Sequence, residues 1–175
     1  MIDGGPGAEP GRRVDAWLVT DAKAELSGAI RRLAAEHGAI ASVAEFHGPD
    51  LLIRPKRVVH TSHPAYGYLI QSGGKSIVWA PEFFVFPRWA AGAAIMFAEA
   101  AGWDHPIRFA GGFGGHLDVM SVARAARRYG VSRLVFSHLG RPTLRALDDG
   151  KRPSFGEFAR DGQAFVIRSG HPAPR

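Results

Sequence analysis

The chain has 175 residues, of which 46% are hydrophobic and none is cysteine, and Lys and Arg exceed Asp and Glu by six. This length suits one ordinary domain, and the lack of cysteine excludes disulfides, thiolate metal ligands and thiol catalysis. No apolar run approaches a membrane span and no signal pattern begins the chain, so we expect a cytoplasmic protein without membrane association. The positive surplus favours an anionic partner such as DNA.

Hydrophobic periodicity predicts short elements in the first half of the chain. Residues 13–20 end in an apolar run typical of a buried strand, and apolar positions at helical spacing predict a helix over 25–37. Gly73-Gly74 predicts a hairpin turn between strands at 67–72 and 75–79. Three further short strands are predicted, at 40–46, 51–55 and 56–60.

Strands and helices alternate in the second half, which is typical of an α/β domain. The strands are expected at 93–98, 133–137 and 165–168. The helices are expected at 89–91, 119–129 and 142–149. Without an internal repeat or linker, residues 1–175 are read as a single domain in which 169–175 form a loose tail.

Histidines and acids near these strands carry the most specific pattern. His60 and His63 precede a Gly-Tyr strand, Glu82 follows the next strand, and His138 ends the strand after Gly130. This pattern resembles the metallo-β-lactamase superfamily over roughly residues 2–168. The resemblance implies an α/β fold, a metallo-β-lactamase-like αββα sandwich. Its N-terminal sheet should be reduced here, and a homodimer is one way to cover the exposed sheet edge.

The loop that carries the family's His-x-His-x-Asp-His signature is altered in this chain. Its four ligand positions hold Asp21, Lys23, Glu25 and Leu26, and lysine and leucine offer zinc no lone pair. We expect the Lys23 ammonium to point inward and to balance the acids that include Asp21 and Glu82; contact with phosphate and a solvent-facing position are the alternatives. Asp21 could cap the helix that follows, orient a histidine or activate water.

Two further carboxylates, Glu82 and Glu99, are expected to act in catalysis. Glu82 precedes Phe83-Phe84, and aromatic surroundings should raise its pKa and suit it to acid–base chemistry; a solvent-facing turn residue is the alternative. Glu99 lies in an apolar run, where an unpaired carboxylate is costly, so His116 is its expected partner. A similar pair in the tRNase Z branch, which the chain resembles here, implies that the histidine is a general acid.

The expected site residues therefore divide into two groups. The expected catalytic residues are Asp21, Glu82, Glu99, His116 and His138. The expected substrate-binding residues are Lys23, His60, its rival His63, Phe83 as a ring that stacks on a base, and Arg141 as a phosphate contact.

Missing metal ligands, retained acids and positive charge favour a nucleic-acid hydrolase that needs no cofactor. The preferred form is a DNA glycosylase that excises a base such as uracil, because carboxylates can stabilise a cationic sugar; the chain resembles a uracil-DNA glycosylase lineage on this fold. The alternative is a metallohydrolase that cleaves phosphodiesters or other esters, with mononuclear Zn or Mn. Its ligands would be Asp21, His60, Glu82 and His138. A third reading is a non-catalytic relative with a decayed site.

Overall fold

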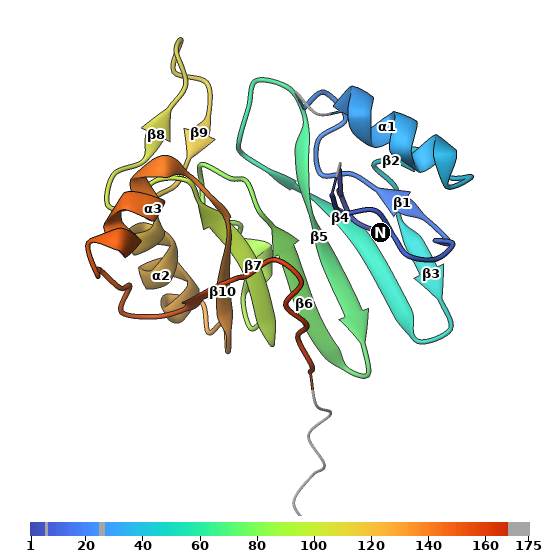
Figure 1. Ribbon diagram of the computed structural model, residues 1–175. Coiled ribbons are helices and arrows are strands. Elements are labelled where there is room, and N and C mark those ends of the chain that lie inside the picture. Colours follow the sequence, from blue (N-terminus) through green and yellow to red (C-terminus); the bar gives the residue numbers. More distant parts are fainter. Residues whose placement is uncertain (6, 25–26, 168–175) are drawn as a thin grey trace, which may run out of the picture.

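A seven-stranded sheet forms the centre of the protein, a computed structural model in which residues 1–5, 7–24 and 27–167 are described (Figure 1). The sheet is antiparallel from β3 to β6 and parallel from β6 to β11. Its strands, in spatial order, are β11 (Glu157–Phe158), β10 (Leu134–Leu139), β7 (Ile95–Ala100), β6 (Lys75–Ala80), β5 (Ala65–Ser72), β4 (Leu51–Val58) and β3 (Phe46–Gly48).

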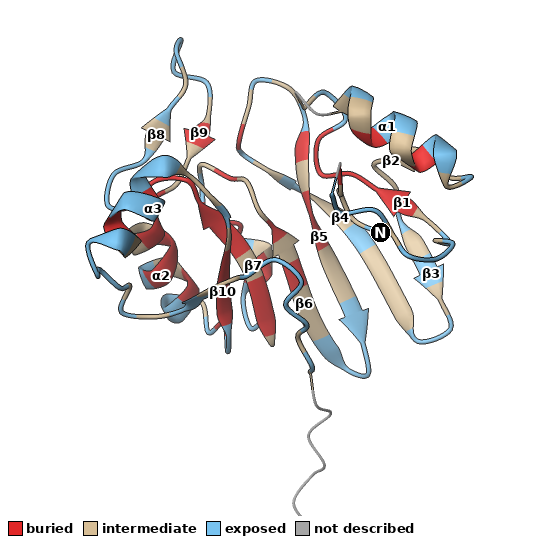
Figure 2. Ribbon diagram, viewed as in Figure 1, coloured by how far each residue is buried: buried red, intermediate tan, exposed pale blue. Residues whose placement is uncertain are grey.

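Two helices, α2 (Val119–Arg128) and α3 (Arg141–Asp148), cover the parallel half of this sheet. The apolar face of α2 is fully buried, and Figure 2 shows the buried residues concentrated in α2, β7 and β10. The Asp118 side chain accepts the Ser121 N–H at 2.8 Å and so caps α2. Among the described residues, no helix is long and apolar enough to cross a membrane.

The N-terminal layer is small and packs on the other side of the large sheet. Strands β1 (Trp17–Leu18) and β2 (Ala41–Ser42) are parallel, and α1 (Ser27–Glu36) covers them by packing Ile30 and Ala34 against Trp17. Hydrogen bonds tie this layer to the large sheet: the Tyr68 hydroxyl donates to the Val19 carbonyl, the Tyr66 N–H to the Thr20 carbonyl and the Trp79 indole to Asp3. The expected helix–sheet–sheet–helix order with a reduced N-terminal sheet is confirmed.

Several predicted boundaries are wrong. Strand β4 continues through Pro55, because β3 pairs only with Leu51 to Ile53 and proline is tolerated where no partner strand needs its N–H. Residues 165–167 are not a strand, whereas β8 (Ile107–Arg108), β9 (Gly115–His116) and β11 were not predicted. The hairpin at Gly73-Gly74 is confirmed, and both glycines have the positive φ that its turn requires. The predicted tail at 169–175 lies outside the described residues.

Candidate active site

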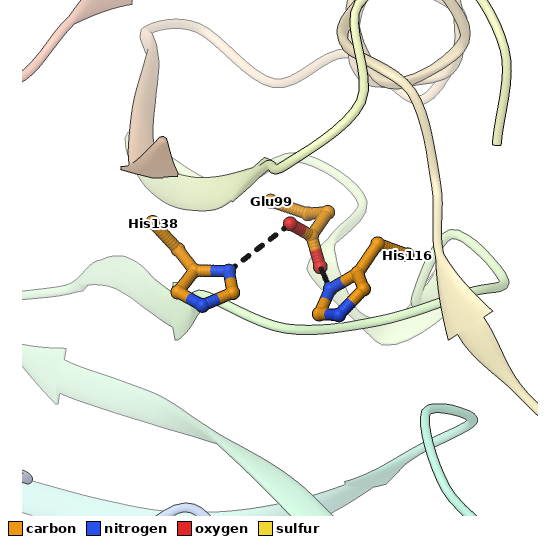
Figure 3. A group of neighbouring side chains, drawn as sticks. All are labelled: Glu99, His116 and His138. Atoms are coloured by element: carbon orange, nitrogen blue, oxygen red, sulfur yellow. Dashed lines mark hydrogen bonds and ion pairs between the residues drawn. The ribbon is translucent and has the colours of Figure 1, made fainter. Parts of the chain in front are cut away.

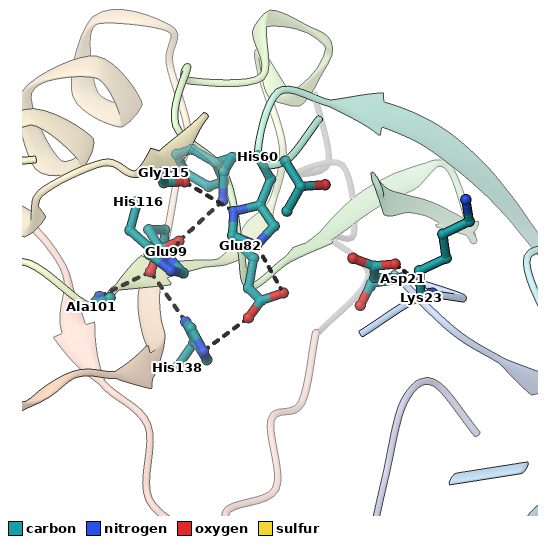
Figure 4. A network of polar contacts seen from close by, with 12 residues as sticks. Asp21, Lys23, His60, Glu82, Glu99, Ala101, Gly115, His116 and His138 are labelled. Atoms are coloured by element: carbon teal, nitrogen blue, oxygen red, sulfur yellow. Dashed lines mark hydrogen bonds and ion pairs between the residues drawn. The ribbon is translucent and has the colours of Figure 1, made fainter. Parts of the chain in front are cut away.

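The central parallel strands bring three predicted site residues to one edge of the sheet. Glu82 follows β6, Glu99 lies near the end of β7, and His138 lies near the end of β10. Because these neighbouring strands are parallel, their carboxyl ends meet there, which is the usual location of sites in α/β folds. His60, from the loop after β4, and His116, from β9, complete the cluster (Figure 4).

Glu99 is the fully buried anchor of this cluster. Its Oε1 accepts the N–H groups of Ala100 at 3.0 Å and Ala101 at 2.9 Å, and its Oε2 accepts the N–H of Phe83 at 3.1 Å. Figure 3 shows the same carboxylate bonded to Nδ1 of His116 at 2.8 Å and Nδ1 of His138 at 3.3 Å. The expected Glu99–His116 contact is confirmed. Burial raises the pKa of Glu99, but its histidine partners lower it more, so the carboxylate is ionised.

His60 is held by the β8–β9 hairpin at two points. The N–H of Gly115 donates to the His60 carbonyl at 2.7 Å, and the Gly115 carbonyl accepts from His60 Nδ1 at 2.9 Å. The hairpin can come this close to His60 only if position 114 is glycine, because a Cβ on Gly114 would lie 1.7 Å from the His60 carbonyl oxygen. The His60 ring is therefore fixed in position and is 5% exposed.

The three histidine rings of the cluster, those of His60, His116 and His138, all direct Nδ1 toward a hydrogen-bond acceptor. Each Nδ1 faces a group that can only accept, either the Gly115 carbonyl or the ionised Glu99, so each Nδ1 carries a hydrogen. The lone pair of each neutral ring then lies on Nε2. Ring centroids of His60 and His116 are 4.8 Å apart, and those of His116 and His138 are 5.3 Å apart.

Glu82 lies between two of these Nε2 atoms. Its Oε1 is 3.0 Å from Nε2 of His138, and its Oε2 is 3.5 Å from Nε2 of His60. Burial raises the pKa of Glu82, but the hydrogen bond from His138 and nearby histidine charges outweigh it and leave the pKa lowered. The expectation of a raised pKa is wrong, because it considered only the aromatic neighbours.

His138 supplies positive charge between the two carboxylates. Its hydrogen bonds to Glu82 and Glu99 raise its pKa to about 10. It also has a φ of 55°, unusual for a residue other than glycine, at a point where the β10–β7 register shifts. Such backbone outliers cluster at functional sites, where surrounding contacts hold them.

Imidazole nitrogens and carboxylate oxygens of this kind fit a divalent metal ion. Nε2 of His60 and Nε2 of His138 each face one oxygen of the Glu82 carboxylate, so these side chains offer two nitrogens and a carboxylate, and three protein ligands with an open position define catalytic zinc sites. Gly115 and Glu99 hold the ligand histidines from behind, as outer partners in metal sites do. Glu99, His116 and His138 also have potential ligand atoms within 4.8 Å of one another. Each oxygen of Glu99 already accepts at least two hydrogen bonds, so Glu99 is better suited to orient His116 and His138 than to bind an ion itself.

Asp21 lies apart from this network and has its own partner. Its Oδ1 accepts the Lys23 N–H at 2.7 Å, and its Oδ2 is 2.7 Å from Nε2 of His63. Both oxygens are therefore engaged, and Asp21 is not placed among the metal donors as the sequence suggested. The alternative that Asp21 orients a histidine agrees with this contact.

The inward position expected for Lys23 is wrong. Its side chain is exposed, no ion pair within the described ranges includes it, and Figure 4 shows its amino group directed away from Asp21 and Glu82. His138, which lies between the acids, provides the balancing charge instead. Glu25 and Leu26 lie outside the described residues.

The two remaining predicted residues differ in their placement. The Phe83 ring is 0% exposed and packs against Phe86, so it cannot stack on a base as expected; its N–H instead supports Glu99. Arg141 is exposed at the start of α3, and its contact with substrate stays a prediction.

A cavity of about 440 Å³ opens beside Glu82 and His138. Its other side includes Asp3, which the sequence did not single out. Asp3 accepts the N–H and hydroxyl of Thr20 at 2.8 and 2.9 Å and the Trp79 indole at 3.0 Å. Burial raises the pKa of Asp3. Because Asp3 is followed by Gly4-Gly5 and belongs to no helix or strand pattern in the sequence, only the fold shows that it lines the cavity.

The chain matches no protein-family model and no curated protein. Solved structures do resemble it, and three of them illustrate the similarity. Zn²⁺-bound PqqB from Methylobacterium extorquens is 14% identical with a TM-score of 0.66, over 95% of this chain and 82% of PqqB. A diphosphatase of the PhnP family is 15% identical with a TM-score of 0.63, over 93% and 76%. The metallo-β-lactamase fold protein YhfI from Bacillus subtilis is 15% identical with a TM-score of 0.56, over 83% of this chain and 62% of YhfI.

These similarities establish the fold of the chain. It is the metallo-β-lactamase fold, as the resemblance implied. The chain spans about three fifths of the length of YhfI. The comparisons give no support to the resemblance to a uracil-DNA glycosylase lineage.

Proposed function

We propose that this chain is a metal-dependent hydrolase with one divalent ion, such as zinc, held by His60, Glu82 and His138. One observation carries the proposal: Nε2 of both histidines faces the same carboxylate, while Nδ1 of each ring is fixed from behind. A carboxylate and imidazoles arranged in this way are the donors that zinc prefers. These three residues are the ligands expected from the sequence for the metallohydrolase alternative, without Asp21.

The protein's own groups would divide the work of hydrolysis. A bound divalent ion would polarise the scissile bond and lower the pKa of the attacking water. Glu99 and Gly115 would keep the ligand rings in place, which limits reorganisation during reaction. The cavity next to Glu82 and His138 would receive the substrate.

The base-excision hypothesis has less support. It depended on Lys23 as a substitute for the cation, and the Lys23 side chain is exposed. The neighbour described as a diphosphatase and the Zn²⁺-bound neighbour agree better with a metallohydrolase. Excision of uracil, and DNA as a partner, stay predictions.

Reconstitution with metal tests the proposal. The full chain would be stripped with chelator, loaded with Zn²⁺ or Mn²⁺, and assayed on carboxylic esters and phosphodiesters with nitrophenol leaving groups. We expect about one ion per chain, hydrolysis that chelator abolishes, and loss of both in Glu82→Gln. Glu45→Gln, at an exposed glutamate paired with Arg54, is the matched control. Removal of uracil from DNA by chelator-treated protein, without ester hydrolysis, would contradict the proposal.

A further inference from the structure

The Asp21–His63 pair is an ionisable unit that the proposed metal site does not use. Nε2 of His63 is 2.7 Å from Asp21 Oδ2, and the Asp21 side chain is 5% exposed. The Lys23 N–H fixes the second carboxylate oxygen at 2.7 Å. The carboxylate is therefore held on both sides, and it in turn holds the ring of His63.

The acid of this pair lies at the cavity that Glu82 and His138 border, and His63 is bonded to that acid. Asp21 lines the same cavity of about 440 Å³, and Figure 4 shows Asp21 across from Glu82. His63 is three residues after His60, so their Cα atoms are at most about 11 Å apart. Asp21 therefore lies across the cavity from Glu82, and His63, which is bonded to Asp21 and close in sequence to His60, is within reach of a substrate held at the proposed metal site.

The free side of His63 is suited to proton transfer. No hydrogen bond in the described part of the chain involves its Nδ1, and 27% of its side chain is exposed. A carboxylate bonded to the other ring nitrogen fixes the tautomer and stabilises the imidazolium, as the aspartate does in a catalytic triad. Asp21 would thus act through His63 as a positioning residue.

We infer that His63, positioned by Asp21, is the general acid that protonates the leaving group of the substrate; this inference rests on the proposed hydrolase function. The water oxygen forms a bond to the carbonyl carbon or phosphorus, and the bond to the leaving oxygen breaks. The leaving oxygen keeps that electron pair and takes the proton from Nδ1 of His63. The proton lost by the water passes to solvent, and His63 regains a proton from solvent.

A second histidine–carboxylate pair, Glu99–His116, competes for this role. It is more buried, with 14% of the His116 side chain exposed, and it lies among the ligand histidines and not across the cavity. In a displacement at phosphorus the attacking and leaving oxygens are roughly in line, so the group that protonates the leaving oxygen belongs opposite the attacking water. That position favours His63 over His116.

A series of leaving groups tests the inference. The metal-loaded full chain and its His63→Gln variant would be assayed on esters of one acid whose leaving groups range from nitrophenols to alkyl alcohols. We expect kcat to fall about 100-fold or more for alkyl alcohols and by less than about threefold for nitrophenols, because good leaving groups need no proton. Asp21→Asn should show the same trend with smaller losses. His47→Gln is the control, since His47 bonds Glu45 at 2.8 Å but is exposed on β3.

The outcomes separate this inference from the proposed function. If wild type cleaves esters but His63→Gln loses activity equally across the series, or loses none, His63 is not the acid and the hydrolase proposal stands. The same holds if His116→Gln alone shows the leaving-group trend. If metal-loaded wild type cleaves no ester, the proposed function and the inference fail together. Imidazole should restore alkyl ester cleavage to a His63→Ala variant, and failure to do so when its metal content and circular dichroism match wild type would overturn the inference.

Discussion

The two sides of the cavity beside Glu82 and His138 hold acids in different ways. On the side of the large sheet, Glu82 faces imidazole nitrogens of His60 and His138. On the side of the small sheet, Asp3 is bonded to Thr20 and the Trp79 indole. Both sides carry carboxylates, but the imidazoles around Glu82 can exchange a proton for a metal ion, whereas the groups bonded to Asp3 cannot.

This difference explains how a metal site can be built without a histidine at residues 21–26. A carboxylate bonded to indole and backbone N–H groups accepts from groups that do not lose their hydrogen, so its lone pairs stay occupied. A carboxylate between histidines has neighbours that become ligands once they are deprotonated. The side of the large sheet therefore offers three donors, although residues 21–26 contain no histidine.

The largest difference between the two sides should appear in metal affinity. His138→Ala removes a ligand, so we expect zinc affinity to fall more than about 100-fold. Asp21→Asn, on the other side, should leave the affinity within about threefold, because Asp21 is engaged with His63 and Lys23. Competition with a chromophoric chelator measures both. A larger loss in Asp21→Asn than in His138→Ala would reverse the comparison.

Glu99→Gln should have an intermediate effect on metal affinity. The amide would place N–H groups against backbone N–H donors, so we expect zinc affinity to fall about 10- to 100-fold and the free energy of unfolding to fall by about 1–3 kcal/mol. Glu157→Gln, at an exposed glutamate paired with Arg133, is the control and should change neither quantity. Unaltered zinc affinity in a folded Glu99→Gln protein would remove Glu99 from its orienting role.

Asp3→Asn should affect folding and leave metal binding unchanged. Its new amide would face either the Trp79 indole or the Thr20 N–H, both of which are donors. We expect the free energy of unfolding in urea to fall by about 1–3 kcal/mol and zinc affinity to stay within about twofold. A large drop in zinc affinity would place Asp3 in the metal site.

The smallest expected effect is a pH dependence of the metal-free protein. The pKa of His138 is raised to about 10 from an ordinary value of 6.5, so the folded state binds its proton more tightly than the unfolded state. The stabilisation from His138 is complete below pH 6.5 and is lost as the pH rises toward 10. The melting-temperature difference between wild type and His138→Asn, with chelator present, should therefore shrink from pH 6 to pH 10. A difference that grows with pH would contradict the assignment of charge to His138.

The fold of the second half could be predicted because its signals are local. Alternating apolar strands and amphipathic helices fix a parallel arrangement, and strand ends then bring Glu82, Glu99 and His138 to one edge. The Glu99–His116 contact followed from one physical argument, that a carboxylate in an apolar run needs a partner.

Features that depend on distant partners could not be predicted in the same way. Asp21 and His63 are 42 residues apart, and nothing in either neighbourhood identifies the other. The direction of the Lys23 side chain depends on how its loop packs against the sheet. The need to balance nearby acids, on which the prediction rested, does not determine that packing. The raised pKa expected for Glu82 failed because desolvation was considered without the two histidines that the fold brings to it.

The position of a bound metal ion tests the central claim most directly. Crystals of the full chain soaked in zinc would be measured at the zinc absorption edge, where anomalous scattering locates the ion. We predict one peak bounded by Nε2 of His60, Nε2 of His138 and the Glu82 carboxylate. A peak between Glu99 and His116, a peak at Asp21, or no peak in protein that binds zinc in solution would contradict the account.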